Sequence, residues 1–142
     1  MTAAPLQVAL RGAGGEPVDL WRTLVSHGFA GLPPHRLDEE ARTFETTLAL
    51  DGFRPRTVRL RRGKQGFGVV EPLGRAPGKR EREAIAAAVT HILRLDEDLS
   101  AFYALIAADE ELSWAAAGAG RMLRSPTVFE DVVKTICTTN CA

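Results

Sequence analysis

Residues 121–142 read RMLRSPTVFEDVVKTICTTNCA, and this stretch is the most informative part of the chain. It contains two helix start signals. Ser125 suits the N-cap position, with Pro126 at the first helical position, where the missing N–H of proline costs nothing. Thr127 and Glu130, three residues apart, form a capping-box pattern. Both signals predict the same helix.

Apolar residues recur along this helix at spacings of three and four, which is the period of one helix face. They are Phe129, Val132, Val133, Ile136 and Cys137. We expect this stripe to be buried, and we expect Glu130, Asp131 and Lys134 to lie on the solvent-exposed face.

Asn140 falls on the apolar stripe. Its amide must find hydrogen-bond partners in the protein, in water or in a ligand, because burying an unpaired polar group costs about 1–3 kcal/mol. Asn140 is therefore a candidate site residue. The alternative is that Asn140 emerges at the C-terminal end of the helix and caps it, as asparagine often does.

The run from Arg121 to Asn140 resembles the start of the catalytic domain in the helix-hairpin-helix DNA glycosylase superfamily. The resemblance is closer to the 8-oxoguanine and 3-methyladenine branches, where an Arg/Leu-rich turn and a proline precede an apolar helix. In the 8-oxoguanine branch that helix ends in an Ile-Cys-Ser-Ser-Asn-type run. Residues 136–140 match this run position by position, with threonines in place of the serines.

The resemblance implies removal of damaged purines from double-stranded DNA by base flipping. It places Asn140 near the space left by the extruded base, and it makes Thr139 and Arg124 further candidate DNA-binding residues. Arg121 and Arg124 match the family's turn, where we expect structural pairing first and DNA contact second. No cofactor is implied.

The family's glycine-rich hairpin and its later catalytic aspartate, joined by a lysine in the lyase-competent branch, have no match in these 142 residues. No catalytic residue is therefore assigned. Asp131 and Lys134 match no catalytic position of the family and are expected to be surface charges. We interpret the chain as the incomplete N-terminal part of a longer enzyme. This interpretation predicts that Phe129, Val133 or Ile136 is partly uncovered.

The hydrophobic pattern before this stretch predicts an α+β protein. Alternating residues predict four strands, near residues 6–10, 44–50, 58–60 and 67–70, joined as an antiparallel sheet, with a helix opened by Pro17 packed on it. Helical periodicity then predicts helices over residues 79–95, 99–106 and 109–118. We place an antiparallel sheet domain at residues 1–76 and the first helices of an all-α glycosylase domain at 77–142, an order that the resemblance shares.

Two surface features have alternative interpretations. The aromatic residues Phe102, Tyr103 and Trp114 could form a base-stacking platform, but their spacing favours core packing. The predicted outer face of the sheet carries arginines such as Arg59 and Arg61. The second functional hypothesis is a non-enzymatic module that binds nucleic acid or a partner protein through this basic face, and it predicts no exposed apolar helix.

Composition gives the remaining expectations. Eighteen basic and eighteen acidic residues give zero net charge, so whole-chain charge does not indicate a nucleic-acid partner. Cys137 and Cys141 share no motif spacing with the three histidines, so no metal site is expected. Two reduced cysteines, no signal peptide and no membrane-spanning segment lead us to expect a cytoplasmic protein without membrane partners. We also expect a monomer.

Overall fold

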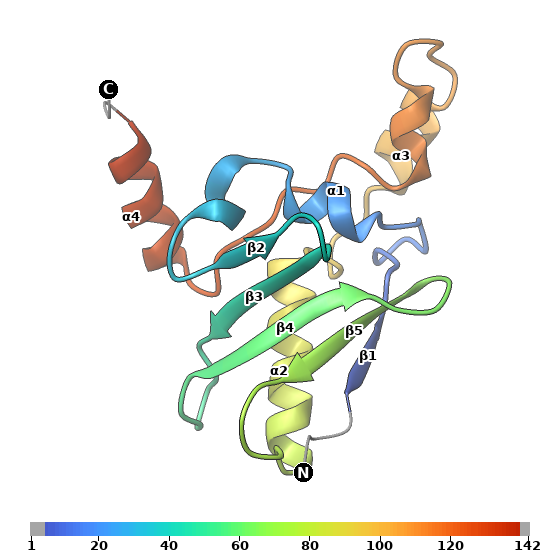
Figure 1. The fold of residues 1–142 in the computed structure, drawn as a ribbon. Helices are drawn as coiled ribbons and strands as arrows, with labels where there is room; N and C mark the ends of the chain where they lie inside the picture. Colours follow the sequence, from blue (N-terminus) through green and yellow to red (C-terminus); the bar gives the residue numbers. More distant parts are fainter. Residues whose placement is uncertain (1–4, 140–142) are drawn as a thin grey trace.

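The computed structural model describes residues 5–139 and has an α+β fold. Its sheet contains β1 (Leu6–Ala9), β2 (Arg36–Asp38), β3 (Thr43–Leu48), β4 (Arg56–Arg62) and β5 (Phe67–Pro72). The strands lie in the order β1-β5-β4-β3-β2, and each neighbouring pair is antiparallel. Figure 1 shows the twisted sheet with one long helix across its far side.

The sheet has five strands, so the predicted count of four is wrong. The additional strand, β2, has three residues and pairs Leu37 with Phe44 at the sheet edge. Three residues are too few to display an alternating pattern. A turn follows β2 directly, where the Asp38 carboxylate accepts a hydrogen bond from the Ala41 N–H at 2.8 Å.

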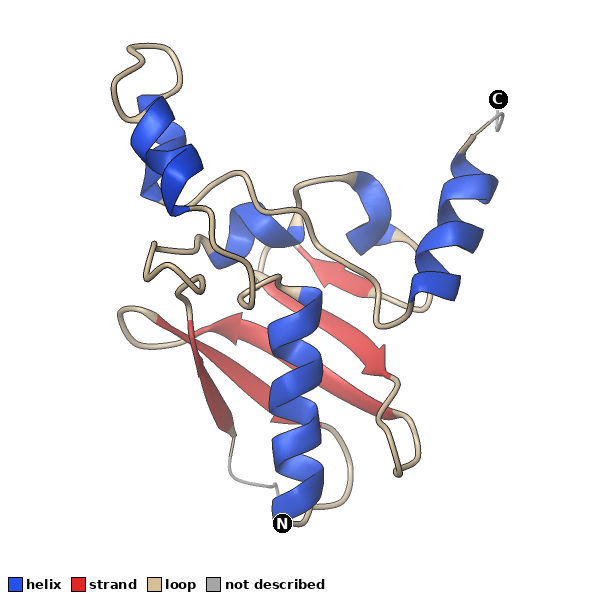
Figure 2. Cartoon of the chain, turned by 180° about the vertical axis from the view of Figure 1, so that it is seen from behind, coloured by secondary structure: helices blue, strands red, loops and turns tan. Residues whose placement is uncertain are grey.

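Alternation determines which face of the sheet is buried. In β3, Phe44, Thr46 and Leu48 are buried and the intervening residues are half-buried. The inner face packs against α2 (Lys79–Ile92), which contributes the buried side chains of Ile85 and Val89 to the same core. Figure 2 shows α2 lying across the sheet. Burial of these aliphatic side chains is the main force that holds sheet and helix together.

The helix predicted after Pro17 is α1 (Leu20–Leu24), and it begins later than expected. Asp19 is its N-cap, since the carboxylate accepts a hydrogen bond from the Arg22 N–H at 3.0 Å. Leu20 and Leu24 are buried in the main core. A short 3₁₀ helix, η1 (Gly28–Gly31), follows.

A second, smaller core joins α3 (Ser100–Ile106) to the 3₁₀ helix η2 (Ser113–Ala117). It contains Tyr103, Ile106, Ala115 and Ala119. Tyr103 is buried as predicted, but Phe102 and Trp114 are 42% and 58% exposed, so the prediction of core packing is wrong for those two. The buried face of α3 contains Tyr103 and Ile106, and Phe102 lies outside it.

The C-terminal helix α4 (Val128–Thr138) begins at the predicted capping box, with the Thr127 hydroxyl accepting a hydrogen bond from the Glu130 N–H at 3.2 Å. The expected burial of its apolar stripe is wrong, whereas the prediction that Phe129, Val133 or Ile136 is partly uncovered is confirmed. Phe129, Val132, Val133 and Ile136 are 40–78% exposed, Cys137 is also exposed, and Lys134 is the buried residue of the helix. Among residues 5–139, nothing covers the apolar face of α4.

Candidate functional site

The strap between η2 and α4, residues 118–127, carries the two arginines of the predicted turn. Arg121 is buried and forms an ion pair with Glu16. Its guanidinium also donates to the backbone oxygens of Arg94 and, at 2.9 Å, of Glu97. The Glu16 carboxylate accepts a second hydrogen bond from the Leu99 N–H at 2.7 Å. Arg121 thus joins three segments that are far apart in sequence.

A glycine makes room for this ion pair. A Cβ at Gly12 would lie 1.9 Å from Arg121 Nη2 and 2.0 Å from Glu16 Oε1. Both atoms are the far ends of flexible side chains, so a side chain at residue 12 would require the Arg121–Glu16 ion pair to shift. Glycine at this position leaves the pair undisturbed.

Arg124 forms ion pairs at the end of the α2–α3 connection. It donates to the Glu97 carboxylate and lies 3.4 Å from His91 Nδ1 and 4.0 Å from Asp96 Oδ1. The hydrogen bond from Arg94 holds the pKa of Glu97 below its ordinary value, and the charges of Arg124 and Arg121 add to this effect. Both arginines of the turn therefore make the structural pairs expected of them.

α4 is attached to the rest of the protein through a polar cluster formed by Lys134, His35, Glu130 and Ser125. Lys134 Nζ lies 2.5 Å from His35 Nε2, 2.5 Å from Glu130 Oε1 and 3.3 Å from Ser125 Oγ. The side chains of His35 and Lys134 are 2% and 8% exposed. Burial, reinforced by the charge of Lys134, lowers the pKa of His35 to about 4, so His35 is neutral near pH 7 and its Nε2 accepts from the lysine.

The prediction that Lys134 is a surface charge is therefore wrong. Glu130 and Lys134 are four residues apart and form an ion pair between helix neighbours, which was not among the predictions. His35 was missed, because it lies 99 residues from Lys134 in the sequence and no local pattern connects them. Ser125 is not the N-cap that was predicted, since Thr127 has that position. Ser125 is buried, and its N–H donates to Asp131 Oδ1 at 3.0 Å.

Serine, lysine, histidine and glutamate within hydrogen-bond reach are the residue types of an activated nucleophile. Here, however, Ser125 is 2% exposed and its hydroxyl accepts from a lysine that a carboxylate also holds. A substrate cannot reach it. The cluster therefore fixes the position of α4.

The predicted DNA-binding residues are not gathered into one site by the described part of the chain. Thr139 lies at the C-terminal cap of α4, exposed, with its hydroxyl donating to the Ile136 carbonyl at 3.0 Å. Arg124 precedes the other end of this 11-residue helix, which is about 16 Å long. Asn140 lies outside the described residues.

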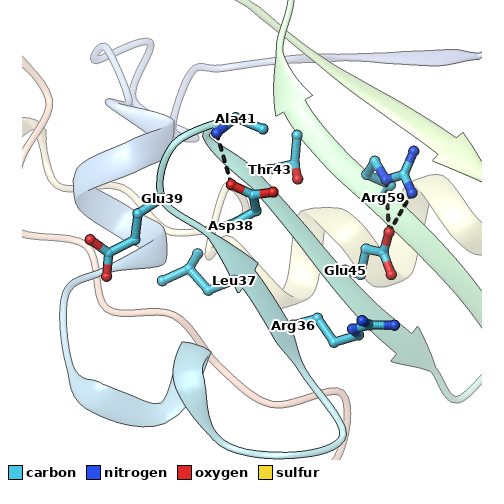
Figure 3. Close-up of a pocket in the computed structure, with 8 residues that line it drawn as sticks. All are labelled: Arg36, Leu37, Asp38, Glu39, Ala41, Thr43, Glu45 and Arg59. Carbon is cyan, nitrogen blue, oxygen red and sulfur yellow. Dashed lines mark hydrogen bonds and ion pairs between the residues drawn. The ribbon is translucent and has the colours of Figure 1, made fainter.

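The outer face of the sheet carries charges of alternating sign. Arg36 lies opposite Glu45 in the register of β2 and β3, and Glu45 lies opposite Arg59 of β4. Arg59 donates to Glu45 at 2.6 and 2.8 Å, as the dashed lines in Figure 3 indicate, and Arg61 donates to Glu71 at 2.9 Å. The hydrogen bond to Glu45 raises the pKa of Arg59. Much of the predicted basic face is thus neutralised by its own carboxylates.

Two further absences concern only the described residues. Between residues 5 and 139, no three side chains of the His, Cys, Asp and Glu types lie together as a potential metal site. Over the same part of the chain, no helix has the length and apolar character needed to cross a membrane.

No protein-family model matches this sequence, and no curated protein matches it. Among solved structures, the chain is similar to a 3-methyladenine DNA-glycosylase from Archaeoglobus fulgidus, with a TM-score of 0.69 and 22% sequence identity. The match covers 96% of this chain and 45% of the glycosylase chain, so the chain spans less than half the length of that protein. The chain therefore has a DNA-glycosylase-like fold.

Proposed function

We propose that this chain is the N-terminal part of a DNA base-excision-repair glycosylase of the helix-hairpin-helix superfamily, which removes a damaged purine after base flipping. The observation that carries the proposal is the structural likeness to a DNA glycosylase over 96% of the chain. The run at residues 136–140 and the uncovered apolar face of α4 support it independently. In this proposal the catalytic groups belong to a region that follows the chain.

A glycosylase has to expose the glycosidic bond of a base that is stacked inside a duplex. Unstacking costs a few kcal/mol per step, which phosphate contacts and a side chain inserted into the gap offset. In the proposed enzyme, Asn140 and Thr139 follow α4 and would hold the opened duplex, with Arg124 as a further DNA contact. The sheet domain would serve as the rigid support for α4.

The proposed domain division is residues 1–76 for the sheet and 77–142 for the start of the helical domain. Double-stranded DNA with a damaged base is the proposed partner and the enzyme is proposed to act as a monomer.

The test begins with the reading frame beyond Ala142. The longer product and the chain of 142 residues would be purified, and base release would be measured from duplex oligonucleotides that carry 8-oxoguanine or 3-methyladenine. We expect release by the longer product alone. Release by the short chain, a natural stop after Ala142, or an inactive folded longer product would each contradict the proposal.

A non-enzymatic module that binds through the outer sheet face remains the competing function. It requires cations that are free to meet phosphate, yet Arg59 and Arg61 are paired with Glu45 and Glu71. Salt-dependent DNA binding by the chain alone that is lost in Arg59→Glu/Arg61→Glu would favour the module. We expect this double variant to leave any DNA binding unchanged.

A further inference from the structure

α4 contributes no side chain to either hydrophobic core. None of the residues Val128–Thr138 belongs to the main core or to the smaller core around Tyr103, and Lys134 is the buried residue of the helix. Figures 1 and 2 both show α4 standing apart from α2. Its attachment is therefore carried by polar contacts, which are the cluster around Lys134 and the hydrogen bond from the Ser125 N–H to Asp131.

His35 is the member of this cluster whose residue type changes charge near neutral pH. Its ring is buried, 5.1 Å from the Phe44 ring of β3 between centroids, and Nε2 lies 2.5 Å from Lys134 Nζ. Because Nε2 accepts from the lysine, the proton of the neutral ring is on Nδ1. Among residues 5–139, this Nδ1 is buried without a hydrogen-bond partner. The site therefore holds the neutral ring and offers Nδ1 no acceptor.

A second proton on this ring would have to bind at Nε2, which faces the ammonium group of Lys134. The charged groups that act on His35 are on α4: Lys134 disfavours the protonated ring, whereas Glu130 and Asp131 favour it. Glu130 Oε1 lies 3.4 Å from Nε2, but it is already bonded to Lys134 at 2.5 Å. The neighbours from the other two segments, Ser125 and Phe44, carry no charge. Protonation of His35 is therefore favoured once α4 has moved away.

Detachment of α4 removes Lys134 from Nε2 and opens that nitrogen to water, where a histidine has a pKa of about 6.5. In the attached state, burial and the charge of Lys134 lower the pKa of His35 to about 4. As the pH falls, the detached state binds the proton first. The ratio of detached to attached molecules should therefore rise about twentyfold between pH 7 and pH 5.

The rest of the protein has no need of α4 to stay folded. The sheet and α2 are held together by the main core, to which α4 adds nothing. An isolated helix of 11 residues, by contrast, is marginal in water, so α4 should lose its backbone hydrogen bonds once it is detached.

We propose that α4 is a pH-dependent element, which detaches from the rest of the protein as a unit when His35 binds a proton, while the sheet and α2 remain folded. This inference goes beyond the proposed function and does not depend on it.

The first measurement is amide hydrogen exchange in the 142-residue chain at pH 7 and pH 5. Each rate is divided by the intrinsic rate at the same pH, which gives a protection factor. We expect the protection of residues 130–138 in α4 to fall about twentyfold between the two pH values. Residues 85–92 of α2 should remain the better protected at both. Equal protection of the two helices would show that α4 leaves only when the whole protein unfolds, and would overturn the proposal.

Two histidine variants test the cause. His35→Gln keeps an acceptor for Lys134 but cannot bind a proton in this range, so the protection of α4 should be the same at pH 7 and pH 5. His91→Gln is the matched control, because His91 lies in α2 outside the cluster, and it should keep the fall of about twentyfold. A fall of wild-type size in His35→Gln would overturn the proposal.

A titration of the wild-type His35 ring by NMR needs no variant, and it decides the matter if His35→Gln does not fold. We expect the ring to bind its proton over the same pH range in which α4 loses protection. A ring that becomes protonated while α4 keeps its protection would show that His35 pairs with Glu130 in place, which would overturn the proposal.

Discussion

Arg121 and Glu16 form a buried ion pair although 105 residues separate them in the sequence. Their side chains are 0% and 5% exposed. The pair connects the turn after β1 to the strap that leads into α4, and the guanidinium also ties in the α2–α3 connection. The pair therefore joins the segment that precedes α4 to a turn near the other end of the described chain.

Removing one member of this pair should be strongly destabilising. Arg121→Met leaves the Glu16 carboxylate buried without its partner, and such changes cost about 3–5 kcal/mol. Urea unfolding measures the loss. The double variant Glu16→Gln/Arg121→Met should lose less than the sum of the two single variants, because it removes the uncompensated charge. If each single variant loses less than about 1 kcal/mol and the double variant loses the sum of the two, the pair is not energetically coupled.

Stability should fall in mildly acidic solution because of His35. Burial and, to a smaller extent, the charge of Lys134 lower the pKa of His35 in the folded state from 6.5 to about 4. The charges of Glu130 and Asp131 raise this pKa but do not outweigh the two lowering effects. Below pH 6.5 the unfolded chain binds a proton at this site that the folded protein does not. The stability is therefore fully present above pH 6.5 and is lost as the pH falls toward 4. We expect a loss of about 2 kcal/mol between pH 7 and pH 5.

Urea titrations at several pH values would measure this dependence in the wild type and in His35→Gln. The variant should show a flatter profile over the same range. Glu97 and Asp98, whose pKa values are lowered by hydrogen bonds, lose their contributions only at lower pH. A variant profile as steep as that of the wild type above pH 5 would rule out His35 as the cause.

Two glycines with positive φ should respond differently to alanine. Gly118 has φ +113°, and a Cβ there would lie 2.6 Å from the Asp19 backbone nitrogen. Gly66 has φ +79°, and a Cβ there meets nothing within 4 Å. Gly66→Ala should cost about 1 kcal/mol from backbone strain alone. Gly118→Ala should cost about 1–3 kcal/mol more, since the strap must move away from α1. Equal losses in thermal unfolding would contradict this distinction.

The capping box of α4 should control the local stability of that helix. Thr127→Ala removes the side-chain oxygen that accepts from the Glu130 N–H, a change that costs about 1 kcal/mol. Amide hydrogen exchange across residues 130–138 should become about fivefold faster. Thr127→Ser keeps the acceptor and is expected to keep the exchange rates. Unchanged rates in Thr127→Ala would mean that the Lys134 cluster alone fixes the helix.

The sequence specified features that depend on neighbouring residues. The alternation of Phe44, Thr46 and Leu48 identified a half-buried strand, and the spacing of Ile85, Val89 and Ile92 identified a helix. That this helix covers the sheet was not predicted, since the helix after Pro17 was expected to do so. Thr127 and Glu130 fixed the start of α4 within a few residues. Backbone geometry causes these patterns, because side-chain periods of 2.0 and 3.6 residues are properties of each element alone.

Longer-range features could not be predicted from sequence patterns. β2 exists because three residues pair with the edge of β3. The orientation of α4 was predicted in reverse, because periodicity identifies the apolar side of a helix but contains no information about what lies against it. The partners of Arg121 could not be predicted either, because Glu16 lies in a turn 105 residues earlier in the sequence.

The sequence by itself thus determined the α+β class, most element positions and the capped start of α4. Only the tertiary structure decided that Lys134 faces His35 in the interior while Phe129 and Ile136 face solvent. The physical reason is that elements form through local geometry, whereas their orientation follows from the free energy of contacts between residues far apart in the chain. In α4 the buried polar contacts determine the orientation, and the apolar side is left exposed.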